Sequence, residues 1–362
     1  MRIGIEACIL TRPLTGVGIY TSRLVSAMAK LDGVEGIVLF ANGDIPDFDA
    51  PNVRTVRYRN RVQHLAIQLE LPKLLAENRI DILHGPNFYL PLRGKTPMAV
   101  TIHDLSSQFF PGQHSFKHRL SQKFLRPSMK KAERIIAVSE FTSQEIGRYC
   151  PSAEGKIRVV HNGVGENFVP AGDVAKAEIV QRYGLPDRFA LFVGTLEPRK
   201  NVGHLIEAFG KASNIEDLKL VIAGGKGWLY DEIFESVKKL GLEDRVIFPG
   251  YIPSEDLPAL YSSAEFFCYP SIYEGFGLPV LESMACGTPV LTSFNSSMSE
   301  VAGEAALLAD PMDIDSISEG ISKLASEEEL RKNLAERGLW RAKKFSWKSC
   351  ATKTLDIYRE IM

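Results

Sequence analysis

Short runs of apolar residues alternate with longer amphipathic segments along the whole chain. Each apolar run has the length of a buried strand, and the segments between the runs carry apolar residues at helical spacing. This alternation is typical of β-α-β units around a parallel sheet. In the first half the predicted strands are Arg2–Leu10, Gly36–Ala41, Asn52–Tyr58, Asp81–His84, Met98–His103, Arg134–Ser139 and Ile157–His161.

The alternation stops near residues 163–171, where Gly, Asn and Pro gather, and then begins again, which predicts a linker between two domains. The strands predicted for the second domain are Phe189–Gly194, Leu218–Gly224, Arg245–Pro249, Phe266–Tyr269, Pro289–Thr292 and Ala306–Leu308. From about Ser326 to Met362 the pattern predicts two helices, broken near residues 345–347, and no further strand. The expected fold class is α/β, with two Rossmann-like domains. Because ligands of such sheets gather at the carboxyl ends of the strands, we expect the site in the cleft between the domains.

Composition narrows the class of protein. A chain of 362 residues is long enough for two domains that each bury a core, and it has no run of eighteen apolar residues that could span a bilayer. Glu6 stands where a signal peptide needs an apolar run, so we expect a soluble, cytoplasmic protein. The five cysteines are scattered without a Cys-x-x-Cys pair, which argues against a disulfide framework and a structural zinc site.

Charge is divided unevenly along the chain. Residues 1–160 carry 22 Lys and Arg against 14 Asp and Glu, whereas the remainder carries 21 against 30. A basic first half favours partners with phosphates or an anionic membrane surface, although chance variation between domains would also give this split. The segment 116–131 contains six Lys and Arg and no acid, and Phe116, Leu120 and Phe124 recur in it at four-residue spacing. It predicts either an amphipathic helix in weak contact with a membrane or lipid-diphosphate acceptor, or an ordinary helix with a solvated basic face.

Two glycine-containing turns stand between a strand and a helix. Gly16 and Gly18 follow the first predicted strand, and Gly275 and Gly277 precede a helix whose first turn contains Pro279. Glycines at such a turn let backbone N–H groups approach an anion, which the helix dipole also favours. The first turn lacks the third glycine of the dinucleotide fingerprint, so by itself it indicates either a phosphate site or a plain tight turn.

Two carboxylates accompany the second turn. Glu274 lies in the loop and Glu282 on the following helix, for which Gly287 is the expected C-terminal cap, so both side chains can point into one cleft. This arrangement, Glu, seven residues and Glu around Gly-Phe-Gly-Leu-Pro, closely resembles the signature of family 4 of the retaining glycosyltransferases. The resemblance implies the GT-B fold, in which two Rossmann-like domains face each other across a deep cleft.

Other segments resemble the same family. Residues 193–201 look like its strand-to-helix loop with an Arg-Lys pair, and residues 161–164 look like its interdomain Pro-Asn-Gly-Val, with His161 in place of proline. That departure affects only the linker, because a proline there would restrict the backbone rather than contact substrate. The resemblance runs through most of the chain. It implies an N-terminal, acceptor-binding domain of residues 1–165 plus about 346–362, onto which the last helix crosses back, and a C-terminal, donor-binding domain of residues 172–345.

The resemblance also implies roles for single residues. Glu274 would bind hydroxyls of the transferred hexose, Glu282 the ribose of the nucleotide, and His103, at the end of a predicted strand, the donor sugar. Arg199 and Lys200 would stabilise the charge that accumulates on the departing diphosphate, so no metal is expected. The catalytic residues expected are His103, Arg199, Lys200 and Glu274. The donor-binding residues expected are Gly16, Gly18, Gly194, Arg199, Lys200, Tyr251, Ile252, Glu274, Gly275, Phe276, Gly277, Leu278 and Glu282.

Two motifs allow both a functional and a structural interpretation. A lone histidine such as His103 is more often structural than functional, and only the accompanying motifs favour a functional role. The sequence Asp313-Ile314-Asp315 matches a metal motif of the other main glycosyltransferase fold, but a carboxylate at this point is expected to cap a helix over residues 313–324.

We therefore expect a metal-independent retaining hexosyltransferase that resembles bacterial mannosyltransferases of polysaccharide and O-antigen synthesis. The donor expected from this resemblance is GDP-mannose, and the acceptor is a glycan or a lipid-linked glycan. The protein would work without a cofactor, bind no nucleic acid, and act in the cytoplasm or at the inner face of the cell membrane. Two alternatives remain: a nucleotide-sugar 2-epimerase of the same fold, and a non-catalytic subunit that binds a sugar nucleotide. The first needs further acid–base carboxylates in the N-terminal domain, and the second does not explain the set of Arg199, Lys200, Glu274 and Glu282.

Overall fold

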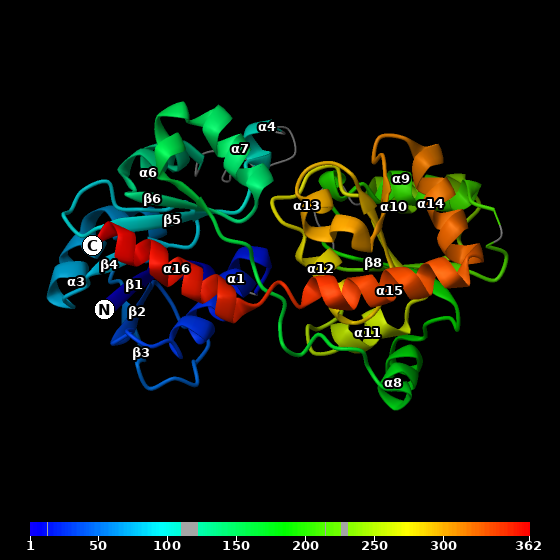
Figure 1. The fold of residues 1–362 in the computed structure, drawn as a ribbon, viewed down its shortest axis with the longest axis horizontal. Coiled ribbons are helices and arrows are strands. Elements are labelled where there is room, and N and C mark those ends of the chain that lie inside the picture. Colours follow the sequence, from blue (N-terminus) through cyan, green and yellow to red (C-terminus); the bar gives the residue numbers. More distant parts are fainter. Residues whose placement is uncertain (13, 110–121, 214, 226–230) are drawn as a thin grey trace. The chain divides into compact units, whose positions relative to one another are not determined.

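The computed structural model describes residues 1–12, 14–109, 122–213, 215–225 and 231–362. The chain divides into two compact units, which are Met1–Gly163 with Phe345–Met362, and Val164–Lys344. Each unit is a parallel β-sheet with helices on its faces (Figure 1). The α/β class with two Rossmann-like domains is therefore confirmed, and the division between the units falls at the start of the predicted linker.

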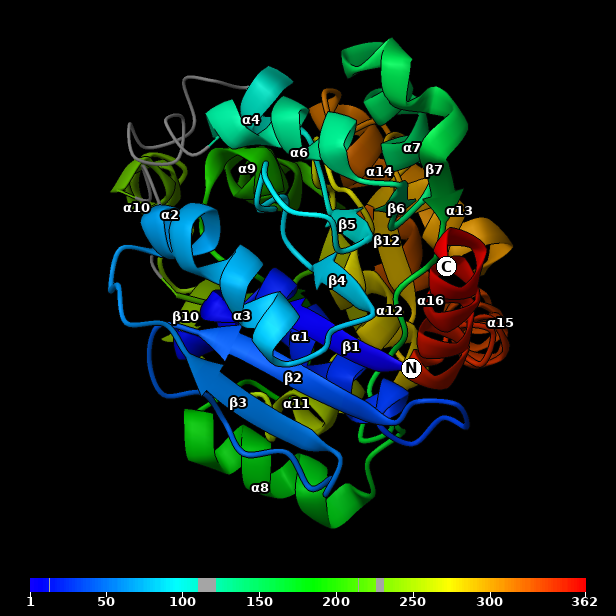
Figure 2. The same cartoon turned by 90° about the vertical axis from the view of Figure 1, so that its left-hand side faces the viewer.

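The first sheet has the strand order β3-β2-β1-β4-β5-β6-β7, with all neighbours parallel, and Figure 2 shows its strands stepping from β3 to β7. Its strands are β1 Arg2–Glu6, β2 Gly36–Ala41, β3 Val53–Arg57, β4 Ile82–Gly85, β5 Met98–Ile102, β6 Arg134–Ala137 and β7 Ile157–Val159. Each overlaps a predicted range. The first strand was expected to continue to Leu10, but it ends at Glu6, because Cys8–Thr11 forms a 3-10 helix in which Leu10 N–H donates to the Ala7 carbonyl at 2.9 Å.

Helices cover both faces of this sheet. The long helices α1 and α16 pack against each other on one face, and Figure 1 shows the red α16 beside the blue α1. A second buried cluster on the other face includes residues of α3, α6 and α7. Among the described residues, the helices of the first unit include α1 Gly16–Met28, α2 Gln63–Leu65, the π-helical η2 Ala66–Glu70, α3 Leu71–Glu77, α4 Ser106–Phe109, α6 Leu125–Lys131, α7 Glu140–Tyr149 and α16 Trp347–Ile361.

The final helix is part of the core of the first unit. Ser346 caps its N-terminus by accepting from Ser349 N–H at 3.1 Å, and Trp347, Leu355 and Tyr358 are buried against the sheet and α1. The backbone at the start of this helix lies very close to the backbone at Gly163, because a Cβ added to Gly163 would lie 2.2 Å from the Trp347 nitrogen. The structure thus places the helix expected at residues 346–362 on the first domain.

A buried chain of polar side chains ties this helix to the sheet. The Tyr358 hydroxyl lies 2.5 Å from His84 Nδ1, His84 Nε2 lies 2.8 Å from the Thr101 hydroxyl, and that hydroxyl lies 2.9 Å from the hydroxyl of Tyr20 on α1. His84 is fully buried, and burial lowers its pKa to about 3, with the nearby His103 contributing. The imidazole is therefore neutral at physiological pH and can donate through one ring nitrogen while it accepts through the other.

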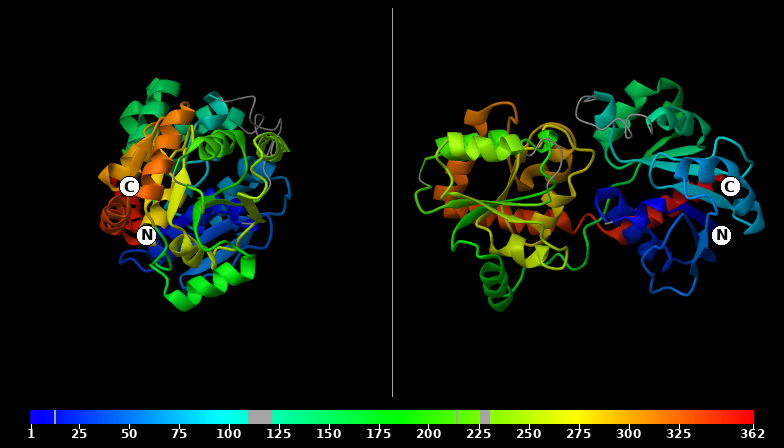
Figure 3. Two further views of the ribbon diagram at one scale, coloured as in Figure 1. Left: turned by 90° about the vertical axis from the view of Figure 1, so that its right-hand side faces the viewer. Right: turned by 180° about the vertical axis from the view of Figure 1, so that it is seen from behind.

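The second sheet has the order β10-β9-β8-β11-β12-β13, again with parallel neighbours. Its strands are β8 Phe189–Val193, β9 Lys219–Ala223, β10 Val246–Gly250, β11 Phe266–Tyr269, β12 Val290–Ser293 and β13 Leu307–Ala309, and each overlaps a predicted range. Helices α9, α10 and α14 lie on one face, and α8, α11, α12 and α15 on the other (Figures 1 and 3). The helix bounds are α8 Asp173–Tyr183, α9 Val202–Lys211, α10 Asp231–Lys239, α11 Leu257–Ser263, α12 Leu278–Ala285, α13 Met298–Ala302, α14 Ile314–Ser326 and α15 Glu328–Ala342.

Asp313 caps α14, since its carboxylate accepts from Asp315 N–H at 2.9 Å. The capping role predicted for this residue is confirmed. The alternative that Asp313 and Asp315 serve as a metal motif has no structural support, because Asp315 instead lies 2.8 Å from the Lys211 ammonium.

Only part of the basic segment predicted at 116–131 can be assessed, because residues 116–121 lie outside the described residues. In the described part, Leu125 and Met129 are buried in the first unit, while Lys123, Arg126 and Lys130 are exposed. This part therefore matches the simpler prediction of a helix with a solvated basic face. No helix within the described ranges has the length and apolar character needed to cross a membrane.

Candidate active site

The predicted ionic residues of the second unit meet where its strand order reverses. Chain order runs outward in opposite directions from β8 and from β11, which are neighbours in the sheet. The loops that follow such a pair diverge to opposite faces and leave room for a ligand at the carboxyl ends of the strands. Arg199 and Lys200 lie in the loop after β8, and Glu274 lies in the loop after β11. The parallel topology is thus what brings together residues that are 74 positions apart in the sequence.

The loop after β8 begins with a close approach of two backbones. A Cβ added to Gly224, which follows β9, would lie 1.8 Å from the Gly194 carbonyl oxygen, so a larger residue at position 224 cannot fit. The loop then forms a 3-10 turn over Pro198–Lys200 and ends at Asn201, which has a φ of 62°. The Asn201 amide donates to the carbonyls of Pro270 and Pro311 at 3.0 and 2.6 Å. These bonds hold a conformation that is unfavourable for a residue other than glycine, and they fix the backbone of the Arg-Lys pair.

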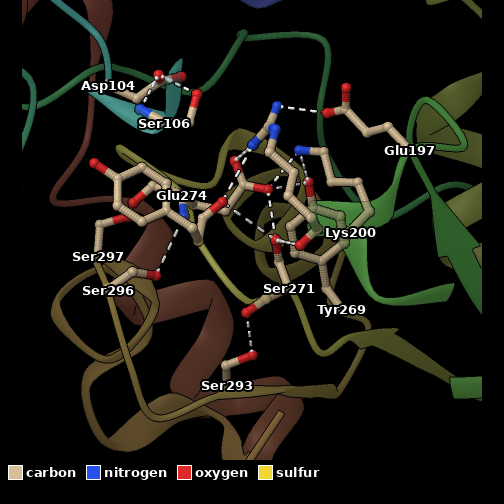
Figure 4. A network of polar contacts seen from close by, with 12 residues as sticks. Asp104, Ser106, Glu197, Lys200, Tyr269, Ser271, Glu274, Ser293, Ser296 and Ser297 are labelled. Atoms are coloured by element: carbon tan, nitrogen blue, oxygen red, sulfur yellow. Dashed lines mark hydrogen bonds and ion pairs between the residues drawn. The ribbon is translucent and has the colours of Figure 1, made fainter. Parts of the chain in front are cut away.

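Arg199, Lys200 and Glu274 form one ionic cluster, in which Lys200 and Glu274 are buried and Arg199 is partly buried (Figure 4). Lys200 Nζ donates to Glu274 Oε1 and to the Tyr269 hydroxyl, the latter at 2.6 Å. Arg199 Nη1 donates to Glu274 Oε2 at 2.9 Å, and Ser271 Oγ donates to Oε1 at 2.9 Å. The side chains of Lys200 and Glu274 are each 9% exposed. Lys200 is therefore buried in the cluster and is not a solvated basic residue.

The cluster keeps the Glu274 carboxylate charged. Burial by itself would raise the pKa of Glu274, but the cations of Arg199 and Lys200 outweigh burial and lower the pKa to about 2. Burial lowers the pKa of Lys200, and the nearby Glu274 carboxylate opposes that shift. Glu274 is thus an ionised hydrogen-bond acceptor at physiological pH and cannot serve there as a proton-donating acid.

The glycine turn before α12 has the geometry of a helix start that only glycine tolerates. Gly277 precedes the helix with a φ of 96°, and a Cβ on it would lie 2.1 Å from Cε of Met298. The backbone of Glu274 is held by two hydrogen bonds: its N–H donates to Ser296 Oγ at 3.3 Å, and its carbonyl accepts from Ser297 Oγ at 2.9 Å. The helix ends at Ala285, and Gly287 follows with a φ of 75°, as expected for a C-terminal cap.

The other residues predicted to bind the donor in this unit have mixed environments. Glu282 lies on α12, where its Oε2 accepts from the Tyr261 hydroxyl at 3.1 Å. Tyr251, directly after β10, is 71% exposed, whereas its neighbour Ile252 and also Phe276 are each only 4% exposed. Gly275 is buried and Leu278 is partly buried at the start of α12. The ring of Tyr251 is therefore accessible to a planar ligand, whereas the side chain of Ile252 is buried in the core.

The remaining predicted residues belong to the first unit. Gly16 and Gly18 lie in the first turn of α1, and a Cβ on Gly16 would meet no other atom within 4 Å. His103, after β5, is partly buried, its Nε2 lies 2.8 Å from the Pro86 carbonyl, and its ring meets the edge of Tyr20 at 4.6 Å. Burial lowers the pKa of His103, although the Pro86 bond and Asp104 oppose the shift. Because a carbonyl only accepts, Nε2 carries the proton of the neutral ring and Nδ1 is an acceptor.

Three residues near the cluster had no predicted role. Tyr269 and Ser271 each bond to Glu274 Oε1, and a Glu197 carboxylate oxygen lies 2.7 Å from Arg199 Nη2. Tyr269 is the last residue of a predicted strand, and Ser271 follows it by two residues. Their position at the carboxyl end of that strand could have indicated that they lie in the site. Glu197 stood inside the resembling loop, but nothing in the spacing indicated that it would turn towards Arg199.

Comparisons with known proteins agree with this geometry. The family profile described as Glycosyltransferase Family 4 matches residues 14–167, and the one described as Glycosyl transferases group 1 matches residues 176–340. The chain is 34% identical over 368 residues to O-antigen chain mannosyltransferase B of Escherichia coli, and the match covers 96% of each protein.

Solved structures agree on the fold. Sucrose-phosphate synthase from Thermosynechococcus elongatus superposes with a TM-score of 0.82 at 22% identity, covering 99% of this chain and 98% of that one. The Anabaena protein HepE, in complex with UDP and glucose, superposes with a TM-score of 0.77 at 17% identity, covering 99% and 100%. These likenesses show the fold of the GT-B glycosyltransferases. The two family profiles and the relative from Escherichia coli show that the chain is a glycosyltransferase of family 4.

Proposed function

We propose that the protein transfers mannose from GDP-mannose, with retention of the anomeric configuration, to a glycan or lipid-linked glycan acceptor. The observation that carries this proposal is the cluster of Arg199, Lys200 and Glu274 at the switch point of the second sheet. The mannosyltransferase activity named for the Escherichia coli relative supports mannose as the sugar and an O-antigen type of glycan as the product.

In the proposed reaction, the bond between the anomeric carbon and the diphosphate oxygen breaks, and negative charge accumulates on the diphosphate. Arg199 and Lys200 offer positive charge and several N–H donors to that charge, and the bonds to Glu274 and of Asn201 hold them in place. The acceptor hydroxyl oxygen bonds to the anomeric carbon on the face that the diphosphate leaves. Its proton passes to the departing phosphate oxygen, so no enzyme carboxylate has to act as a base.

Glu274 has the properties of a residue that orients the sugar. Its carboxylate is ionised; Oε1 accepts from Lys200, Tyr269 and Ser271, while Oε2 accepts from Arg199 and keeps acceptor capacity for a further donor. Hydroxyls of the hexose can therefore donate to it while the bonds from Lys200 and Ser271 remain. Hydrolysis by a pair of carboxylates would instead require one carboxyl group with a raised pKa, which is the opposite of the direction here.

We assign the acceptor to the first unit and the donor to the second. The neutral ring of His103 leaves Nδ1 as an acceptor for a hydroxyl of the donor sugar, and the first turn of α1 at Gly16 and Gly18 offers backbone N–H groups to a phosphate. Closure of the two units around the donor, with a cleft between them, remains a prediction from the sequence. Tyr251 is proposed to contact the base, because its ring is exposed beside the end of β10.

Contact with a membrane is proposed to be weak, electrostatic and at the cytoplasmic face. The exposed Lys123, Arg126 and Lys130 support attraction to anionic lipids, whereas the burial of Leu125 and Met129 argues against insertion of this part of the segment. Flotation with vesicles that contain anionic lipid tests the contact. We expect binding at low salt that disappears at high salt, and binding that is insensitive to salt would contradict an electrostatic contact.

A donor panel tests the function. The protein is incubated with GDP-mannose, GDP-glucose, UDP-glucose and UDP-galactose and with a mannose-terminated oligosaccharide, in the presence of EDTA, and the release of nucleoside diphosphate is measured. We expect turnover with GDP-mannose that EDTA does not abolish, and an axial product linkage in the NMR spectrum. Turnover with a UDP-sugar alone would overturn the donor, loss of activity in EDTA would overturn metal independence, and no turnover with any donor would overturn the proposal.

A further inference from the structure

Glu197 adds a second carboxylate to the cationic pair. It lies two residues before Arg199 in the loop after β8, and its Oε1 is 2.7 Å from Nη2 of Arg199 (Figure 4). Arg199 uses its other terminal nitrogen, Nη1, for Glu274 and for the carbonyl of Tyr273 at 3.2 Å. Glu197 therefore pairs with the terminal nitrogen Nη2 of Arg199, whereas Glu274 pairs with Nη1.

The two carboxylates are held very differently. Glu274 accepts from Lys200, Arg199, Tyr269 and Ser271, and its side chain is 9% exposed. The Glu197 side chain is 28% exposed, and in the described parts of the chain its carboxylate has a polar contact only with Arg199. Glu197 can turn into water at little cost, because a partly exposed carboxylate is readily solvated, whereas removal of Glu274 would take away the carboxylate that pairs with the buried Lys200 ammonium.

The charges of these four residues cancel. Arg199 and Lys200 carry two positive charges, and Glu197 and Glu274 carry two negative charges. A neutral cluster offers a diphosphate little net attraction, although the guanidinium fork has the geometry to bind a phosphate through two N–H groups. A phosphate and the Glu197 carboxylate cannot both take the Nη2 edge, so one must replace the other.

We infer that Glu197 is a placeholder for the donor's phosphate: its carboxylate occupies Nη2 of Arg199 in the empty protein, and a diphosphate oxygen displaces it on binding. The inference rests on the proposed function, because it assigns the displacing anion to the donor. When the product diphosphate leaves, Glu197 returns to Arg199 and lowers the affinity of the site for that product. The residue therefore sets how tightly the diphosphate is held, without contacting the sugar.

Binding measurements on the full chain test this exchange. We compare the wild type with Glu197→Gln and Glu197→Ala by calorimetry, with GDP, UDP, inorganic pyrophosphate and guanosine as ligands. Glu243→Gln is the matched control, because Glu243 is exposed and precedes β10 at the opposite end of the sheet from the cluster. Loss of one competing, partly exposed ion pair is expected to tighten the binding of GDP and pyrophosphate by about two- to fivefold.

Each result of this comparison has one meaning. Tighter binding of GDP and pyrophosphate in both Glu197 variants, with guanosine unchanged and the control like the wild type, would support the exchange. Unchanged or weaker diphosphate binding in the variants, while the wild type binds GDP or UDP, would overturn the inference and leave the proposed function standing. Failure of the wild type to bind GDP, UDP and pyrophosphate would overturn both.

Discussion

Replacement of Lys200 by methionine separates the structural role of the ionic cluster from its chemical role. Methionine keeps the length of the buried stem but removes the ammonium group that donates to Glu274 and Tyr269. The Glu274 carboxylate then stays buried with Arg199, Tyr269 and Ser271 as its remaining donors. One strong, charged hydrogen bond is lost, and part of a buried negative charge is left uncompensated.

The expected cost follows from burial. The side chains of Lys200 and Glu274 are each 9% exposed, so solvent screens their interaction little. Breaking a buried pair by removing one partner typically costs about 3–5 kcal/mol, and the remaining donors to Glu274 place the expected loss near the lower end. For a unit of this size, about 3 kcal/mol corresponds to a fall in Tm of about 6–12 °C. The double variant Lys200→Met with Glu274→Gln removes both charges and should recover at least about 1 kcal/mol of that loss.

Thermal and urea unfolding of the two single variants and the double variant form the assay, together with the rate of diphosphate release. The control is Lys211→Met, which breaks an ion pair with Asp315 in which the lysine side chain is 55% exposed, and which should lower stability much less than Lys200→Met because water screens the pair. We expect the double variant to regain stability but no activity. Equal losses for Lys200→Met and Lys211→Met, or full activity of the double variant, would refute the reasoning.

Four further outcomes follow from single contacts. Tyr358→Phe leaves His84 Nδ1 without its partner and should lower the free energy of unfolding by about 1–3 kcal/mol in urea titrations. The pKa of His84 is lowered to about 3, so the unfolded state takes up its proton first as the pH falls below 6.5; the stability of the wild type relative to His84→Gln should therefore decrease between pH 6.5 and 3. Burial raises the pKa of Glu6 above 4.5. The stability of the wild type relative to Glu6→Gln should therefore decrease in the same titrations as the pH rises from 4.5 through the raised pKa. Gly277→Ala places a side chain at a φ of 96° and should cost about 1–2 kcal/mol in thermal unfolding and weaken GDP binding in calorimetry; unchanged binding would separate the turn from the phosphate site.

The strands could be predicted because buried parallel strands are continuous apolar runs with turn residues at their ends. Gly36–Ala41 and Phe266–Tyr269 have the same bounds in the structure as in the prediction. The meeting of Arg199, Lys200 and Glu274 also followed, since residues in loops after neighbouring parallel strands end at one edge of the sheet.

Other features could not be predicted, because they depend on contacts between distant segments. The bond between Tyr358 and His84 joins residues 274 positions apart, and no local pattern records it. Likewise, helical spacing of Leu125 and Met129 shows an apolar face without telling whether that face meets a membrane or the core. The pairing of Glu197 with Arg199 depends on a side-chain orientation that the motif does not encode.

A crystal structure of the protein with GDP tests the central claim most directly, because it locates the diphosphate relative to Arg199 and Lys200. We predict phosphate oxygens within hydrogen-bonding distance of the Arg199 guanidinium and the Lys200 ammonium groups, with Glu274 still bonded to Lys200. A diphosphate bound elsewhere, with both cations in contact only with protein groups, would contradict the account.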